Sequence, residues 1–209
     1  MSFDTLAPHY RWMERVLAGG KLQRCRTAFL NRIPPPRRAL LVGEGNGRFL
    51  EEFARRFPNA QVTCLDASAK MLEEARRVPQ TNGNVRFIHA NIFDWTPPPA
   101  EFDLIVTNFF LDCFQAQQLS TVVGKLASTA APNAAWLLAD FCEPKVGWKK
   151  WRARWILRSM YLFFRFVTKL PAKQLTPPDE FLVREGYRIA ERIDYDWGLL
   201  HAARWERKE

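Results

Sequence analysis

The sequence predicts an α/β fold in which a mostly parallel sheet carries helices on both of its faces. Short, mainly apolar segments alternate with amphipathic segments between residues 38 and 141, and strands that are covered on both faces read as such apolar runs. Near the end of the chain, two further segments that we expect to be strands, 187–197 and 199–208, flank Gly198. Because so short a connection joins antiparallel strands, we expect a hairpin there.

Residues 1–36 are expected to form an N-terminal helical cap. Residues 9–31 have a helical pattern that a pair of glycines interrupts, and three prolines at 34–36 end it. The first residues include Asp4 and Glu14 and lack the apolar core of a secretion signal, so we expect a cytoplasmic protein. The sequence has no run of about 18 uncharged apolar residues, so we expect no membrane-spanning helix.

Residues 37–141 are expected to form the core of the sheet. Three prolines at 97–99 predict a loop between the third and the fourth strand. The expected strands are 38–43, 61–66, 84–90, 102–108 and 133–141, and the expected helices are 47–57, 68–77 and 115–129.

Residues 142–186 are expected to form a basic aromatic insertion, and residues 187–209 the closing hairpin, so that the four segments make one domain. The insertion ends in the stretch "LTPPDEFLVREG", which predicts a short helix. Thr176 can cap this helix, Pro177 suits its first position, and Asp179 completes a capping-box pattern.

The cysteine and histidine content predicts free thiols and no metal site. Cys25, Cys64, Cys113 and Cys142 are scattered without a CxxC pair, and the chain has three histidines without metal-ligand spacing. Hydrophobic residues make up 47% and charged residues 25% of the chain, which is typical of soluble globular proteins.

The turn after the first strand is rich in glycine. It reads Gly43-Glu44-Gly45-Asn46-Gly47-Arg48. A dinucleotide fingerprint needs a third glycine or alanine where Arg48 stands, and a phosphate-binding loop needs Gly-Lys followed by Ser or Thr. Asp66 ends the second strand, 19 residues after Gly47, where a carboxylate can accept hydrogen bonds from both hydroxyls of a ribose.

Five stretches of the chain carry a resemblance to a known family: "LLVGEGNGRFL", "VTCLDASAKML", "VRFIHANIFDW", "FDLIVTNFFLDCF" and "AAWLLADF". Across residues 38–141 the chain resembles the class I S-adenosylmethionine-dependent methyltransferases, particularly the small-molecule and quinone-biosynthesis type. The resemblance implies a Rossmann-like sheet of seven strands, with the last strand antiparallel and placed between the fifth and the sixth. It also implies S-adenosylmethionine as cofactor and S-adenosylhomocysteine as product.

The resemblance further implies which residues contact the cofactor. They are Tyr10 over the methionine end, Gly43, Glu44, Gly45, Asn46 and Gly47 in the turn, Asp66 at the ribose, Ala67, Ser68 and Met71 beside the adenine, Asn91 and Ile92 at the adenine edge, and Asn108 and Phe109 near the sulfonium. Three positions depart from the family pattern, namely Leu41, Glu44 and Asn91. Asn91 still offers a carbonyl oxygen to an amine. For Glu44, contact with the ammonium group of the cofactor and a solvated position near the helix start both stay open.

Methyl transfer from a sulfonium is an in-line displacement, for which the protein supplies alignment and desolvation. Asp112 follows the fourth strand at the carboxyl edge of the sheet, where ligands bind in such folds. It is therefore the candidate catalytic base, although Asp also suits the cap of the next helix. We expect His89 and His201 to be structural, and for Asp140 a role at this edge and a plain turn both stay open.

The formal charge of +9 is concentrated in residues 145–173, which hold nine cations and no acid. At helical spacing one face holds Trp148, Trp151, Trp155, Leu162 and Phe166, and a narrow stripe holds Arg154, Arg158 and Arg165. Three interpretations stay open: a helix packed on the domain with its arginines in water, a lid over an amphiphilic acceptor whose acid or phosphate group binds an arginine, and an interfacial helix on an anionic membrane. As a lid, the segment would offer Trp148, Arg154, Arg158, Tyr161 and Arg165 to the substrate.

The sequence therefore predicts an enzyme that transfers a methyl group from S-adenosylmethionine to a small, apolar or amphiphilic acceptor. We expect it in the cytoplasm, with a peripheral contact to the inner face of a membrane through residues 145–173. The alternative is a non-catalytic module of the same fold that binds a membrane or a partner through that segment. An RNA methyltransferase is a distant alternative, because no added RNA-binding module is evident, and a nicotinamide oxidoreductase is more distant still.

Overall fold

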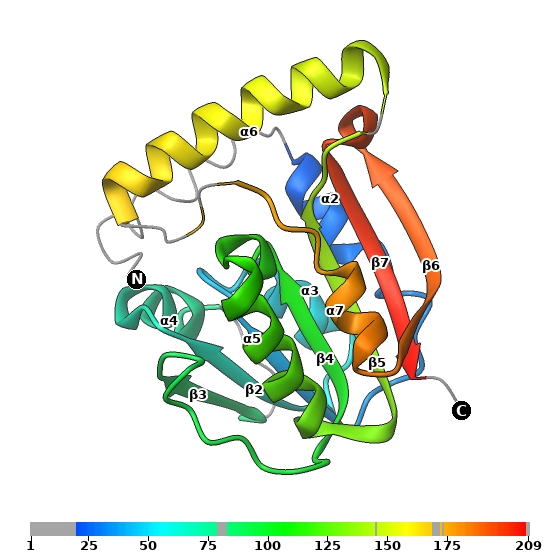
Figure 1. Cartoon of the computed structure of the whole chain (residues 1–209). Coiled ribbons are helices and arrows are strands. Elements are labelled where there is room, and N and C mark those ends of the chain that lie inside the picture. Colours follow the sequence, from blue (N-terminus) through cyan, green and yellow to red (C-terminus); the bar gives the residue numbers. More distant parts are fainter. Residues whose placement is uncertain (1–19, 79–82, 145, 169–171, 173, 208–209) are drawn as a thin grey trace.

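The fold is that of a computed structural model, which describes residues 20–78, 83–144, 146–168, 172 and 174–207, with side chains for all of these except 164–168. It has one seven-stranded sheet in the order β3-β2-β1-β4-β5-β7-β6 (Figure 1). The strands are β1 Arg38–Val42, β2 Gln61–Asp66, β3 Val85–His89, β4 Phe102–Asn108, β5 Ala130–Phe141, β6 Tyr187–Tyr195 and β7 Leu200–Arg207.

Helices cover both faces of this sheet. In Figure 1, α5 and α7 lie in front of the sheet and α2 and α3 behind it. The helices are α2 Lys21–Thr27, α3 Arg48–Arg56, α4 Ala69–Arg76, α5 Ala116–Thr129, α6 Gly147–Thr168 and α7 Asp179–Arg184, with the short 3-10 turns η1 Leu111–Cys113 and η2 Asp196–Gly198. Residues 9–19 of the expected helix at 9–31 lie outside the described residues, and α2 lies in the described part.

The strand order confirms the predicted fold class. The strands β1 to β5 pair in parallel, whereas β7 is antiparallel to both β5 and β6. The chain runs outward from β1 to β3 and then returns to β4 on the other side of β1. A ligand crevice is expected where the order reverses, at the carboxyl ends of β1 and β4.

The core explains why the strands form where they do. The apolar runs of β1 and β4 are buried along nearly their whole length. At the hairpin side, Trp136 of β5 stacks edge-on against Tyr187 of β6, and its Nε1 donates to Thr107 Oγ1 at 2.9 Å. The buried indole therefore has a hydrogen-bond partner, and the antiparallel strands join the same core as the parallel ones.

Two local expectations are wrong. The fifth strand begins at Ala130, directly after α5, and not at residue 133. The capping box before α7 is also absent: Pro178 is the N-cap residue and makes no side-chain cap bond. The carboxylate of Asp179 lies 3.5 Å from Arg192 Nη1 instead, so a contact distant in sequence replaces the local one.

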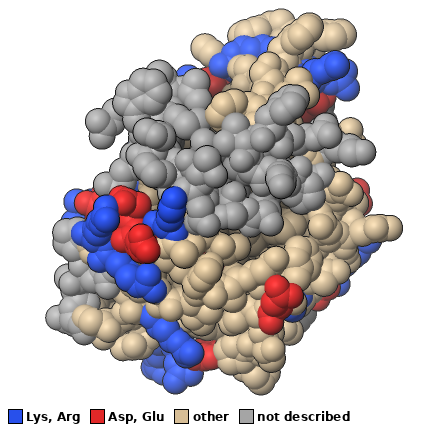
Figure 2. All heavy atoms as spheres, turned by 90° about the vertical axis from the view of Figure 1, so that its left-hand side faces the viewer, with Lys and Arg blue, Asp and Glu red and all other residues tan. Residues whose placement is uncertain are grey.

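The helix α6 lies across the carboxyl edge of the parallel strands (Figure 1). It buries a narrow stripe, Ala153, Leu157 and Tyr161, four residues apart. The tryptophans that share the opposite face are exposed, so this helix does not pack on the domain through its aromatic face. Figure 2 shows Lys and Arg atoms beside uncharged atoms at the top of the molecule, the level at which α6 lies in Figure 1.

Candidate functional site

The glycine turn follows β1 at the expected crevice. Gly43, Gly45 and Gly47 all have φ in the left-handed region, at 66°, 66° and 81°. A Cβ on Gly43 would lie 2.4 Å from the ring of Phe110, and one on Gly47 would lie 2.9 Å from Ala75 Cα, so close packing requires both glycines. Over Gly45 the nearest such atom is 4.0 Å away, so the backbone there is open to a ligand.

Glu44 forms the start of α3. Its Oε1 accepts hydrogen bonds from the backbone N–H groups of Phe49, at 3.0 Å, and Leu50, at 2.8 Å. These donors are among those that a helix start leaves without partners. Burial raises the pKa of Glu44 to about 7. One carboxylate oxygen thus serves the helix, and contact of Glu44 with a cofactor stays a prediction.

Asp66 is held by the backbone on both sides of the turn. Its Oδ2 accepts from Gly45 N at 3.0 Å and its Oδ1 from Ser68 N at 2.9 Å. Burial raises the pKa of this carboxyl, and the two backbone donors oppose the rise. Each carboxylate oxygen keeps a further lone pair, so the fixed carboxylate can still accept hydroxyl groups. Ser68 caps α4 by accepting from Met71 N at 3.2 Å.

A lysine that the sequence analysis did not single out holds the segment after β3. Lys125 Nζ on α5 donates to three backbone carbonyls, those of Ile92 at 3.0 Å, Phe93 at 2.7 Å and Trp95 at 2.9 Å. Asn91 Oδ1 accepts from Phe93 N at 3.1 Å, so one lone pair of its amide oxygen is already used. The sequence hints at this contact only through the position of Lys125, which stands among small and apolar residues of α5.

Asn108 ends β4 and is a strong candidate for a ligand contact. It is 7% exposed, and neither its Oδ1 nor its Nδ2 has a hydrogen-bond partner among the described residues. Buried amide atoms are nearly always bonded, to protein, water or ligand. The next residue, Phe109, has φ of 53° and donates its N–H to Ala139 O at 2.7 Å. This distorted strand end faces the glycine turn through Phe110. Tyr10, which was expected over the methionine end of the cofactor, lies outside the described residues.

Two buried carboxyls lie beside this strand end. Asp140 of β5 accepts from Asp112 N at 3.2 Å and from Phe141 N at 2.9 Å. Burial and the neighbouring carboxyl raise the pKa of Asp140 well above its usual range, and burial also raises the pKa of Asp112. Burial and the nearby second carboxyl thus disfavour the state in which both carboxyls are ionised.

The structure rules out two simpler roles for these residues, a helix cap for Asp112 and a turn for Asp140. Asp112 does not cap the next helix, because Gln115 is the N-cap residue of α5. Asp140 is fully buried within β5 and does not form a turn. His89 is exposed, and its Nε2 lies 3.2 Å from Ala67 O.

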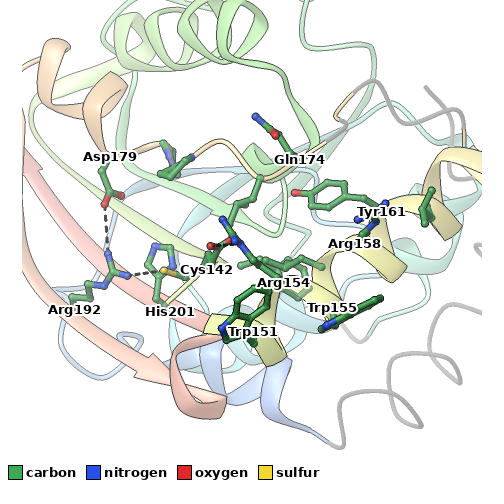
Figure 3. A pocket seen from close by; sticks show the side chains of 17 residues that line it. Cys142, Trp151, Arg154, Trp155, Arg158, Tyr161, Gln174, Asp179, Arg192 and His201 are labelled. Atoms are coloured by element: carbon green, nitrogen blue, oxygen red, sulfur yellow. Dashed lines mark hydrogen bonds and ion pairs between the residues drawn. The ribbon is translucent and has the colours of Figure 1, made fainter. Parts of the chain in front are cut away.

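A pocket of about 890 Å³ opens between α6 and the ends of β5 and β7 (Figure 3). Tyr161 of α6 joins the pocket to the carboxyl pair, since its hydroxyl donates to Asp112 O at 3.0 Å. Apolar walls come from both sides, and they include Phe141, Trp151, Trp155, Leu157, Leu162 and Leu175.

Three arginines and a histidine line the same pocket. Arg154 is paired with Glu143 at 2.9 Å, and Arg192 contacts Asp194, Asp179 and the sulfur of Cys142 (Figure 3). Within the described part of the chain, the guanidinium of Arg158 has no acidic partner. Burial lowers the pKa of His201 to about 4, and its ring nitrogens have no partner among the described residues.

The predicted lid residues therefore divide. Arg154, Arg158 and Tyr161 line the pocket, whereas Trp148 lies outside it and contacts Trp197, with ring centroids 5.9 Å apart. The side chain of Arg165 lies outside the described side chains. The described residues contain no cluster of His, Cys, Asp and Glu that suits a metal ion, and none of their helices is long and apolar enough to cross a bilayer.

Known proteins match the cofactor side of this site. Residues 39–133 match the family model of a methyltransferase domain. A trans-aconitate 2-methyltransferase of Rhodopseudomonas palustris is 48% identical over 64 residues, which cover 30% of this chain and 23% of that protein. A malonyl-(acyl-carrier protein) O-methyltransferase of Halorhodospira halophila is 29% identical over 143 residues, or 67% of this chain and 46% of that one. The chain thus spans less than half the length of either relative.

The fold matches solved structures over nearly the whole chain. The crystal structure of 1,6-didemethyltoxoflavin-N1-methyltransferase of Burkholderia thailandensis holds S-adenosylhomocysteine and 1,6-didemethyltoxoflavin. It aligns with a TM-score of 0.67 and 15% identity, covering 99% of this chain and 86% of that one. The sheet order and these matches show the fold of the class I S-adenosylmethionine-dependent methyltransferases, and residues 39–133 are similar to the methyltransferase domain of that family.

Proposed function

We propose that the chain transfers a methyl group from S-adenosylmethionine to a small acceptor bound in the pocket under α6. The observation that carries the proposal is the set of groups gathered at the strand-order reversal. There, the open backbone at Gly45, the fixed carboxylate of Asp66 and the amide of Asn108, which has no partner among the described residues, lie at neighbouring strand ends. The donor set fits the cofactor: a carboxylate for ribose hydroxyls, an amide that can donate and accept, and bare backbone.

When bound, S-adenosylmethionine supplies the methyl group on a positively charged sulfur. The bond from the acceptor atom to the methyl carbon forms as the carbon–sulfur bond breaks, and a base is needed where the acceptor atom carries a proton that must leave. Asp112 is the proposed base, since it is buried in the turn after β4 and its carbonyl oxygen accepts from Tyr161 of the pocket wall. Burial raises the pKa of Asp112 and that of its neighbour Asp140, which favours Asp112 as a proton acceptor in a buried place.

The acceptor is proposed to be apolar or amphiphilic and to carry an acid or phosphate group. The apolar walls of the pocket suit a hydrocarbon or ring, and Arg158 offers a guanidinium that no described acid neutralises. The acceptors in the names of the two relatives, trans-aconitate and the malonyl group, are acids, which supports a cation near the acceptor. The proposal includes that the protein takes up this acceptor at a membrane surface.

Calorimetry with S-adenosylhomocysteine tests the cofactor half of the proposal. Wild type should bind in the micromolar range and Asn108→Ala more weakly, because the ligand loses the two amide atoms as hydrogen-bond partners. A screen of metabolite extracts with labelled methyl donor then tests the acceptor half. A protein that binds the product but labels nothing, in water-soluble and lipid extracts alike, would favour the non-catalytic module. None of the reported matches supports that module or an RNA methyltransferase.

A further inference from the structure

We propose that the outward face of α6 docks on an anionic lipid bilayer and holds the mouth of the acceptor pocket against it. The delivery of an acceptor rests on the proposed function, whereas the docking itself does not. The outward face consists of Trp148, Trp151 and Trp155, which are 61%, 65% and 68% exposed, with Val146, Ile156, Leu162 and Phe163 beside them.

The spacing of the tryptophans makes this face continuous. They stand three and four residues apart, so they share one side of the helix. Trp197 of η2 extends the face beyond the helix, because it is 57% exposed and contacts Trp148. Soluble proteins rarely expose a contiguous apolar patch of this kind unless it binds something.

The fold does not need this face. The helix is held by the buried stripe Ala153, Leu157 and Tyr161 on its other side. Its first turns are held by Arg152, which pairs with Asp196 at 3.0 Å and lies 4.7 Å from the ring centre of Trp197. The aromatic face is therefore left outward by a helix that is already anchored.

The charge around the face selects the occupant. Lys149, Arg154 and Arg158 are exposed on α6, and the helix has no acid. The neighbouring acids Glu143 and Asp196 are already paired, with Arg154 and with Lys21 and Arg152. Tryptophan with Lys and Arg on one helix suits the interface of an anionic bilayer, whereas a second copy of this chain would bring like charges together.

The pocket opens at the edge of this face. Trp151, Trp155, Arg154 and Arg158 belong both to the exposed side of α6 and to the pocket lining (Figure 3). A helix lying in the interface would thus place the pocket mouth at the level of the lipid headgroups. An amphiphilic acceptor could then pass from bilayer to pocket without crossing water.

Co-sedimentation with vesicles tests the docking. The vesicles are pure phosphatidylcholine, or phosphatidylcholine with one third phosphatidylglycerol. We expect wild type to bind the anionic vesicles and to bind neutral ones far less. The variant Trp148→Ala/Trp151→Ala/Trp155→Ala should lose most of the binding, and Arg154→Gln/Arg158→Gln should weaken it on the order of tenfold.

Matched controls separate this surface from general stickiness. Val183→Ala/Ile189→Ala removes two exposed apolar side chains elsewhere, and Arg55→Gln/Arg77→Gln removes the same charge from α3 and the end of α4. Both should sediment as wild type does. Unchanged melting and S-adenosylhomocysteine affinity in every variant show that the fold and the cofactor site persist.

Three results would overturn the docking. They are absence of wild-type binding to anionic vesicles, equal loss in the control variants, and a wild-type dimer that the tryptophan variant dissociates without any vesicle binding. Because vesicle binding is measured without cofactor, its failure is distinct from failure of the proposed methyl transfer, which the S-adenosylhomocysteine affinity reports.

Discussion

The two halves of the sheet hold their polar side chains in different ways. In the half with β1 to β4, three charged groups of the candidate cofactor site bond to the backbone: Glu44 to the start of α3, Asp66 to both sides of the turn, and Lys125 to three carbonyls. In the half with β5 to β7, arginines on α6 pair with acidic side chains, as in Arg154–Glu143 and Arg152–Asp196.

This difference indicates which half sets which property. Backbone anchors depend on strand register, so the cofactor side can change little without losing its ligand. One pair of side chains can be replaced by another without moving the backbone. We therefore expect the pocket under α6 to tolerate substitutions that suit a new acceptor. The family match agrees, since it covers residues 39–133 and stops before α6.

The largest expected effect is that of Asp66→Ala on cofactor binding. Loss of the two hydrogen bonds that ribose hydroxyls donate to this carboxylate weakens binding by about 3 kcal/mol, or roughly 100-fold. Calorimetry with S-adenosylhomocysteine measures this. Arg158→Gln, on the acceptor side, is the matched comparison and should bind as wild type does. Equal affinities for wild type and Asp66→Ala would contradict the claim that the β1–β4 half binds the cofactor.

Lys125→Met should weaken S-adenosylhomocysteine binding by about tenfold, because three carbonyls beside the expected adenine site lose their shared donor. The exposed Lys149→Met on α6 removes the same charge and should leave this affinity unchanged. The same titration, run with adenosine, should show the loss as well. A loss seen with the full product but not with adenosine would contradict the placement of Lys125 beside the adenine.

The carboxyl pair predicts a pH dependence of stability. Asp140 has a raised pKa in the folded state, so the folded protein binds more protons than the unfolded one, and stability falls as the pH rises above about 4. His201, with a lowered pKa, works in the opposite direction between about 6.5 and 4, so the comparison must be with a variant. The free energy of unfolding of Asp140→Asn, minus that of wild type, should therefore rise from pH 5 to pH 8 in denaturant titrations. If this difference stays constant over that range, Asp140 is ionised throughout.

The smallest expected effect is that of Arg158→Gln on the acceptor. We expect a several-fold rise in KM for an acidic acceptor with little change in kcat, because an exposed charge pair contributes about 1 kcal/mol or less. The assay uses the acceptor found with the labelled methyl donor. A fall in kcat with constant KM would instead place Arg158 in the chemical step.

Much of the cofactor side could be predicted because its signals are local. The glycine turn, the acid that ends β2 and the apolar strands each occupy a few consecutive residues, and the strand order follows from their alternation. Lys125 and the pairing of Asp112 with Asp140 could not be predicted, because they join residues about 30 positions apart. The aromatic face of α6 was visible as a pattern, but periodicity alone cannot tell whether such a face turns inward or outward.

The cap predicted for α7 shows the same limit. The pattern around Thr176 fits a capping box, yet Asp179 lies beside Arg192 on β6. A contact between distant segments outweighs a local preference of about 1 kcal/mol.

Calorimetry of wild type with S-adenosylhomocysteine tests the central claim most directly. The groups gathered at Gly45, Asp66 and Asn108 predict one site per chain, with a dissociation constant in the micromolar range. No detectable heat at millimolar ligand, from a protein that melts cooperatively, would contradict it.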